Sequence, residues 1–309
     1  MKISIRGHMI EIVCSQPFIQ KSLQDFLKLD VSIPKTLLHE IRMSKTVKVN
    51  EEEPNWLKPL NENDRITFKV IYDETITPPP TKMNIEILKE DENLLIINKP
   101  YGIDTHPSSE SDTTSLSNGV AAYFQQQGIQ QKVRHIHRLD RDTSGTILFA
   151  KHALSGAILD RSLERREIKR TYLALVEGIV KTKKGTINKS IGKDRHHSNR
   201  RVVVKTGQKA VTHFEVLEQF PKDNCTLVKL TLETGRTHQI RVHMSSIGNP
   251  LVGDQLYGAK TKNGGRHALH AWHITIPHPF DNTTLHAKAP IPESFCPPLL
   301  LKKIKSNFE

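Results

Sequence analysis

Apolar and polar residues in the first part of the chain alternate in a way that predicts a small unit of strands and helices. A strand is expected over residues 1–14, where apolar residues recur at alternate positions. Over 17–43 the apolar spacing becomes helical, with a break near Pro34, which predicts two helical pieces. Alternating segments at 46–50 and 64–70 predict two further short strands.

Consecutive prolines at 78–80 mark a linker after this unit. Proline lacks a backbone N–H and favours an extended, semi-rigid chain, so this segment is unsuited to a helix or a central strand. We therefore expect an N-terminal module over residues 1–74, a linker over 75–83 and a second domain over 84–309.

The second domain is predicted to be rich in strands. Strands are expected over 85–88, 94–99, 146–151, 169–178, 212–217, 225–233, 269–276 and 285–287. Helices are expected over 114–127, 153–166 and 237–247. In the last of these, Thr237 is the expected cap, and His238, Arg241 and Ser245 recur at a spacing that places them on one face. The basic segment 181–209 is expected to be an irregular, exposed loop.

The net charge of the chain indicates the kind of partner that it binds. The chain has 309 residues, with 45 Lys and Arg against 33 Asp and Glu and a net charge of +12. Such an excess points to a polyanion, and nucleic acid is favoured over a membrane because no apolar run approaches the ~20 residues of a spanning helix. Three distant cysteines and the lack of a signal-peptide core predict a cytoplasmic protein in a reducing compartment.

Several kinds of chemistry find no support in the sequence. The histidines form no His-Glu-x-x-His pattern and have no cysteine pair beside them, so no metal site is expected. The glycine-rich patterns that hold nucleotide phosphates are also missing, so no cofactor is expected. A serine elbow is missing as well.

A carboxylate among cations remains as the candidate catalyst. Asp140 lies between Arg138 and Arg141 directly before a predicted core strand, and a neighbouring arginine keeps a carboxylate ionised. Such a group suits nucleophilic or general-base work on an electrophilic carbon. Tyr172 could stack on an extruded base, while Arg241 could orient the carboxylate. Each residue alone also fits a structural role, as a turn charge, a strand aromatic or a solvated helix charge.

The most basic run is expected to contact RNA phosphates. It contributes four cations: Lys193, Arg195, Arg200 and Arg201. Each phosphate contact should add roughly one unit to the salt dependence of binding.

The segment 137–145 resembles the signature His-Arg-Leu-Asp-x-x-Thr-Ser-Gly of the RluA family of pseudouridine synthases, with every fixed position matched. Further blocks at 99–107, 169–178, 234–243 and 249–258 resemble the other family motifs in the same order. The resemblance covers roughly residues 85 to 300. The order of elements in the first module is similar to that of S4-like RNA-binding modules, although Pro34 and its neighbours replace the usual basic helix start.

The resemblance implies an α+β fold with a long mixed, largely antiparallel sheet, flanking helices and an RNA cleft. It implies that Asp140 is the catalytic aspartate, that Tyr172 stacks on the flipped uracil, and that Arg241 pairs with Asp140. Whether Asp140 attacks the sugar, attacks the base or abstracts a sugar proton stays open. The implied substrate-binding residues are Lys99, His137, Arg138, Arg236, His238 and Ile240. No metal or organic cofactor is implied.

The expected function is isomerisation of uridine to pseudouridine in RNA, by a monomer. Ribosomal RNA of the large subunit is favoured as the substrate, and transfer RNA is the alternative. Two other functions stay open on the sequence: a non-catalytic RNA-binding or ribosome-assembly protein on the same fold, and a metal-dependent nuclease built on the histidines.

Overall fold

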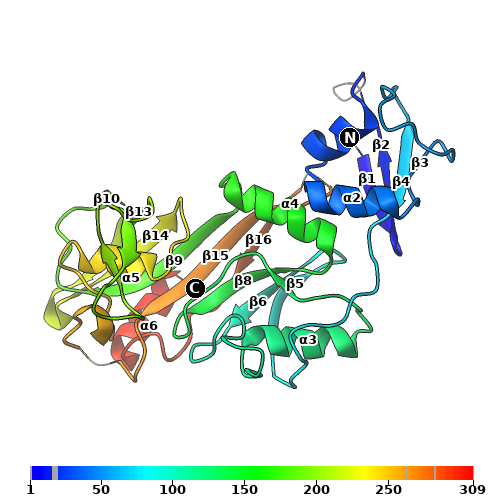
Figure 1. The fold of residues 1–309 in the computed structure, drawn as a ribbon. Helices are drawn as coiled ribbons and strands as arrows, with labels where there is room; N and C mark the ends of the chain where they lie inside the picture. The colour runs from blue at the N-terminus through cyan, green and yellow to red at the C-terminus, as the bar shows by residue number, and fades with distance from the viewer. Residues whose placement is uncertain (1, 16–19, 262, 282, 309) are drawn as a thin grey trace.

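The computed structural model describes residues 2–15, 20–261, 263–281 and 283–308. Figure 1 shows a small N-terminal module beside one end of a much longer sheet, joined to it by an extended segment. Within the described residues, no helix is long and apolar enough to cross a bilayer.

The N-terminal module is a four-stranded antiparallel sheet covered by short helices. Its strands lie in the order β1 (Lys2–Arg6), β2 (Met9–Val13), β4 (Arg65–Lys69) and β3 (Lys48–Val49). Its helical turns are α1 (Leu23–Asp25), η2 (Phe26–Asp30) and α2 (Lys35–Met43). Phe26 and Leu27 pack on Ile10, Ile66 and Phe68 to form its core.

The single strand expected over 1–14 is wrong, because Gly7 turns the chain at a positive φ of 59° and makes a β1–β2 hairpin. The two helical pieces and the strands near 46–50 and 64–70 are confirmed. Residue 1 of the expected strand and residues 17–19 of the expected helix lie outside the described residues.

The long sheet carries the second domain and contains ten strands in the described part of the chain. Along it lie β10 (Lys184–Asn188), β13 (Val211–Phe220), β14 (Cys225–Leu232), β9 (Lys169–Glu177), β15 (Leu269–Pro277), β8 (Ser144–Ala150), β6 (Leu94–Lys99) and β5 (Glu86–Glu90). β16 (Thr284–Lys288) pairs with β15, and β7 (Arg134–His135) pairs with β8. Among these pairs only β15 with β8 is parallel, which confirms the predicted mixed, largely antiparallel sheet.

Helices cover both faces of this sheet, so its central strands are buried on two sides (Figure 1). On one face lie α3 (Leu116–Gln126) and α5 (Gln239–Ser245), whose buried side chains belong to the same apolar cluster as Tyr172 and Ala174 of β9. On the other, α6 (Pro298–Phe308) packs on Leu173 and Leu175, and α4 (Ala153–Glu164) covers the β6–β8 region. Successive side chains of a strand point to opposite faces, which explains this division.

One prediction for the second domain is wrong in part. The segment 181–209 is not irregular throughout, because it contains β10 and a hairpin of β11 (Ile191–Lys193) and β12 (Arg201–Val203), whereas residues 194–200 form the expected, mostly exposed loop. Ile187 and Ile191 are buried, so two apolar anchors within a charged segment suffice to fix it. For the proline-rich C-terminus the sequence predicted no element; it contains α6, which begins at Pro298, where a first-turn proline costs no hydrogen bond.

The proline linker lies against the second domain and does not swing free. The amide of Thr81 donates to the carbonyl of Asn118 on α3 at 3.0 Å, and the Asn118 side chain donates to the carbonyl of Pro79 at 2.9 Å. Just before the linker, Glu74 forms an ion pair of 2.7 Å with Arg134. The linker therefore holds the module close to the sheet.

Candidate active site

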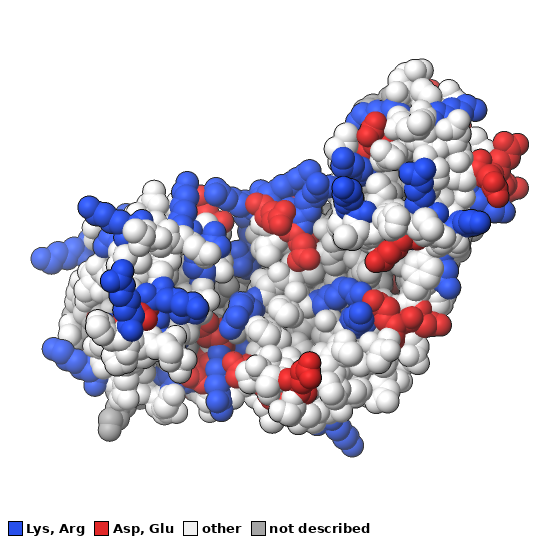
Figure 2. Space-filling model, viewed as in Figure 1, with Lys and Arg blue, Asp and Glu red and all other residues white. Residues whose placement is uncertain are grey.

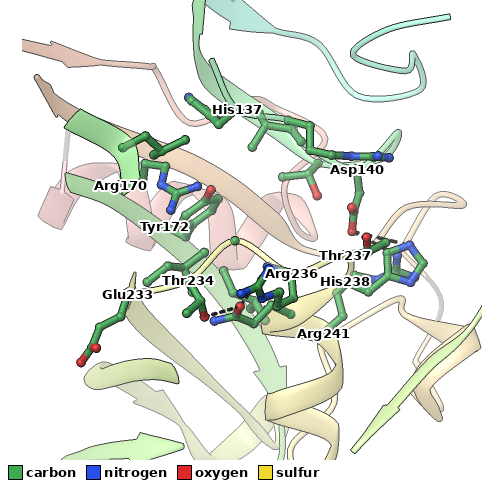
Figure 3. Close-up of a pocket in the computed structure, with 18 of the residues that line it drawn as sticks. His137, Asp140, Arg170, Tyr172, Glu233, Thr234, Arg236, Thr237, His238 and Arg241 are labelled. Carbon is green, nitrogen blue, oxygen red and sulfur yellow. Dashed lines mark hydrogen bonds and ion pairs between the residues drawn. The ribbon is translucent and has the colours of Figure 1, made fainter. Parts of the chain in front are cut away.

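One cavity of about 520 Å³ opens beside the loop that leads into β8 (Figure 3). Its walls come from the loop 136–143, the end of α4, the start of β9 and the segment 232–241. Eight of the nine catalytic and substrate-binding residues expected from the sequence line it: His137, Arg138, Asp140, Tyr172, Arg236, His238, Ile240 and Arg241.

Asp140 is held in place by its own loop. The neighbouring Leu139 is buried, and its backbone carbonyl and amide both bond the hydroxyl of Thr105, at 2.9 and 3.1 Å. After the loop, Gly145 at φ 112° lets β15 approach, because a Cβ there would lie 2.1 Å from the carbonyl oxygen of Ala271. This explains the glycine that ends the motif at 137–145.

The carboxylate of Asp140 faces two positively polarised groups (Figure 3). Its Oδ2 lies 3.3 Å from Nη1 of Arg241 and 3.9 Å from Nε2 of His238. Burial by itself raises the pKa of Asp140, but His238 and Arg241 outweigh it and hold that pKa below its usual value. The group is therefore an ionised carboxylate at neutral pH.

Arg241 is shared between two carboxylates. Its Nε and Nη2 donate to the two oxygens of Asp254 at 2.7 and 2.9 Å, which leaves Nη1 for Asp140. Burial opposes the charge of Arg241, but the bond to Asp254 dominates and raises its pKa. Asp254 was missed as a site residue, although it lies inside the block at 249–258 that the sequence singled out.

The start of α5 differs from the prediction. Thr237 does not cap the helix: the N-cap is His238, in the left-handed region at φ 56°. The preceding loop is held by Gln239, whose amide bonds Thr234 and the backbone of Arg236 on one side and Val211 on the other. This network takes over the task of a capping side chain.

The predicted shared face of α5 is confirmed, and it is directed at one aromatic residue. The ring of Tyr257 lies under the guanidinium of Arg241 at 5.0 Å. Its hydroxyl is 2.8 Å from Nδ1 of His238, and its backbone carbonyl accepts from the hydroxyl of Ser245 at 2.8 Å. Tyr257 is buried and was not predicted as a site residue.

Tyr172 and Ile240 belong to the apolar part of the cavity wall, and both are buried. Burial raises the pKa of Tyr172, so its phenol stays protonated. Arg170 lies two positions earlier on β9 and therefore on the same face; it lines the cavity beside Tyr172 (Figure 3). Strand alternation would have found Arg170, which the sequence analysis missed. Its Nε is buried and has no hydrogen-bond partner among the described residues.

The remaining predicted residues occupy the walls and rim. Burial lowers the pKa of His137 to about 3, so this histidine is neutral, and its Nε2 accepts from the amide of Leu148 at 3.3 Å. Arg138 is exposed, and Arg236 is fixed through a bond from Nε to the carbonyl of Lys209 at 3.2 Å.

The structure contradicts the predicted role of Lys99 in substrate binding. It is fully buried and does not line the cavity. Its ammonium donates to the carbonyls of Pro100, Ile103 and Arg141 at 2.9, 2.7 and 3.0 Å, so its three donors are used within the protein. Lys99 therefore has a structural role: it holds the loop next to Asp140.

The basic hairpin β11–β12 lies beside this site. Lys193 and Arg195 are exposed, whereas Arg200 lies 3.9 Å from Asp194 and 5.8 Å from the ring of Tyr257. The backbone amide of Arg201 donates to the Tyr257 hydroxyl at 2.9 Å. Figure 2 shows Lys and Arg side chains spread over this end of the molecule. No group of three or more potential metal ligands occurs in the part of the chain that the structure describes.

Comparison with known proteins shows that this fold belongs to a class of enzymes that act on RNA. A family model described as RNA pseudouridylate synthase matches residues 93–246, and the RluD ribosomal pseudouridine synthase N-terminal domain matches residues 10–66. The uncharacterized RNA pseudouridine synthase YhcT of Bacillus subtilis is 44% identical over 287 residues, which are 93% of this chain and 95% of that protein. The chain therefore belongs to the RluA family of RNA pseudouridine synthases, as its motifs predicted.

Two further relatives show the same relationship. Ribosomal large subunit pseudouridine synthase D of Nitrosomonas europaea is 38% identical over 231 residues, which cover 72% of this chain and 66% of that protein. The solved structure of human RNA Pseudouridylate Synthase Domain Containing 1 superimposes with a TM-score of 0.57 at 27% identity, covering 71% of this chain and 89% of that one.

Proposed function

We propose that this enzyme converts uridines of large-subunit ribosomal RNA to pseudouridine, with Asp140 as the catalytic residue. The observation that carries the proposal is the ionised carboxylate of Asp140, 3.3 Å from Arg241, in a cavity that also contains Tyr172. The choice of RNA is supported by relatives named ribosomal large subunit pseudouridine synthase D and by the match of the N-terminal module.

The reaction is an isomerisation in which atoms balance without a co-reactant. The bond between C1′ of the ribose and N1 of uracil breaks, the base rotates, and C1′ bonds to C5. The hydrogen on C5 leaves to solvent, and N1 gains a proton. In this proposal Asp140 begins the exchange, because an ionised carboxylate can act on the ribose, on the base or on a sugar proton.

The target uridine must leave its stack to reach Asp140, which costs a few kcal/mol. A cavity of about 520 Å³ lies in the range of pockets that hold a small molecule of this size. Tyr172 supplies the stacking surface, and Ile240 closes the pocket. Exposed Arg138 at the rim occupies the space that the flipped base leaves.

Tritium release tests this proposal. Large-subunit ribosomal RNA labelled with tritium at C5 of uridine is incubated with the enzyme in EDTA, and we expect release of tritium to water. Asp140→Asn should abolish release while RNA binding persists. Asp142→Asn, two residues further along the same loop, is the matched control and should keep most activity.

Transfer RNA with the same label tests the choice of substrate, and faster release from it would overturn the ribosomal assignment. Wild-type enzyme that binds ribosomal RNA but releases no tritium from either RNA would favour a pure RNA-binding protein. Strand cleavage that EDTA abolishes would favour a nuclease.

A further inference from the structure

Tyr257 has two hydrogen-bond neighbours at its hydroxyl, and together they determine where one proton lies. The backbone amide of Arg201 is 2.9 Å away, and Nδ1 of His238 is 2.8 Å away. An amide can only donate, so the phenol oxygen accepts from Arg201. The single proton of the phenol is then directed at His238, since a buried hydroxyl proton without an acceptor is costly.

This donation selects one form of His238. A neutral imidazole that accepts at Nδ1 carries its proton at Nε2. Burial lowers the pKa of His238 and raises that of Tyr257, so the imidazole is neutral and the phenol is protonated. The opposite form, with the proton at Nδ1, would leave the Tyr257 proton without a partner among the described residues.

The proton at Nε2 faces the reactive carboxylate. Nε2 of His238 lies 3.9 Å from Oδ2 of Asp140, which is an electrostatic contact and longer than a hydrogen bond (Figure 3). His238 holds this place in a left-handed backbone conformation, at φ 56° and ψ 21°. Such a conformation in a residue other than glycine is strained and persists only where its surroundings fix it.

We propose that Tyr257 is a positioning residue that sets the tautomer of His238 and so directs an N–H group at Asp140. Because Arg201 begins β12, the same phenol connects the carboxylate to the basic hairpin. The docked hairpin supplies the donor that forces the phenol proton toward His238. This inference rests on the proposed role of Asp140 in catalysis and extends it to a residue outside the cavity wall.

Two variants separate the tautomer from mere support. Tyr257→Phe removes the donor to Nδ1, so His238 can move its proton to Nδ1 and turn a lone pair toward Asp140. We expect kcat to fall by roughly 10- to 100-fold, the loss found when a hydrogen-bond partner that orients a metal-bound histidine is removed, with KM little changed. His238→Gln keeps an N–H donor on a side chain of similar reach and has no tautomers, whereas His238→Ala has no donor.

The double variant is the decisive comparison. If Tyr257 acts through the tautomer, Tyr257→Phe should change kcat by less than about twofold when His238 is already Gln. Equal losses in both backgrounds would mean that Tyr257 only supports the hairpin, and would overturn the inference. His238→Gln should also retain more activity than His238→Ala, and the reverse order would contradict a donor role.

Nitrogen-15 NMR of the imidazole gives a measurement that does not depend on activity. With histidine labelled and the His238 signals assigned by their loss in His238→Gln, we expect Nε2 protonated and Nδ1 unprotonated in the wild type. Tyr257→Phe should shift this population toward Nδ1–H. A wild-type protein with the proton on Nδ1 would overturn the inference, whatever the RNA assays show about Asp140.

Discussion

At the scale of single residues, Arg241 shows how the candidate site fixes the orientation of a charged group. A guanidinium has donors in a rigid fork, so two bonds to Asp254 fix the direction of the third toward Asp140. The cation stays buried because it is shared between two carboxylates and lies over the ring of Tyr257. Asp254 thereby orients the group that contacts Asp140, without contacting Asp140 itself.

Replacement of Asp254 tests this arrangement. Asp254→Asn removes one charge from a buried pair, so the protein should lose about 3 kcal/mol of unfolding free energy. Its kcat should fall because Arg241 is free to turn away from Asp140. Urea unfolding and tritium release measure the two effects, with exposed Asp223→Asn as control. An unchanged kcat in Asp254→Asn would contradict the positioning role.

Lys99 gives a prediction about pH. Burial lowers its pKa to about 7, whereas in the unfolded chain the pKa of lysine is about 10.4. Between these values the unfolded state binds more protons, so stability rises with pH across this window. Wild-type protein should therefore gain stability relative to Lys99→Met as pH increases from about 7 to 10. Exposed Lys89→Met is the control, and a constant difference between wild type and Lys99→Met would contradict the prediction.

These residues mark how far the sequence predicts the site. The motif around Asp140 indicated which residues meet at the cavity, because strong family patterns preserve spacing. The motif could not show that the Lys99 ammonium donates to backbone carbonyls of the protein, or that Asp254 holds Arg241. The first depends on how the loop after β6 folds back over Lys99 and on Arg141, 42 residues further along the chain. The second depends on a contact between α5 and a loop 13 residues later. Neither follows from the periodicity of a single helix or strand.

At the scale of elements, β9 explains why the strands were easier to predict than the basic segment. Its apolar run is buried on both faces, so the pattern alone indicates a central strand. β10 is an edge strand paired with β13, and its other residues are a lysine, a glycine, a threonine and an asparagine, so the single buried Ile187 gives no strand pattern. The C-terminal helix α6 was likewise not predicted, because the prolines that precede it do not indicate a helix.

At this scale we predict that the basic hairpin β11–β12 contacts RNA phosphates. Lys193→Gln and Arg195→Gln should each reduce the salt slope of RNA binding by roughly one unit, because both side chains are exposed. Arg200→Gln should reduce it less, since this arginine already contacts Asp194 and Tyr257. Binding titrations over a range of salt concentrations measure the slopes. Lys303→Gln on α6, on the opposite face of the sheet, is the matched control, and equal slopes for all variants would contradict phosphate contact.

At the scale of the whole molecule, the module and the cavity are joined through packing. Leu154 of α4 and Phe280 from the loop after β15 belong to the same apolar cluster as Phe26 and Leu27 of the module. In Figure 1 the module lies at the α4 end of the long sheet, and β10, β13 and α5 lie at the other end. The cavity is lined by the end of α4 and by the segment that leads into α5, so it lies between these two ends. We expect an RNA that runs from the module to the basic hairpin along this side to pass the cavity.

Phe280 tests whether this fixed geometry contributes to substrate selection. Phe280→Ala opens a space where the module packs and should cost about 3–5 kcal/mol of stability. Phe280 does not line the cavity, so kcat should persist while KM rises for a long ribosomal RNA fragment and stays unchanged for a short one. Phe295→Ala, which removes a buried ring beneath α6, should cost similar stability without changing either KM. If both variants raise KM for the long fragment equally, the effect is general loosening, and the docking of the module has no part in choosing the RNA.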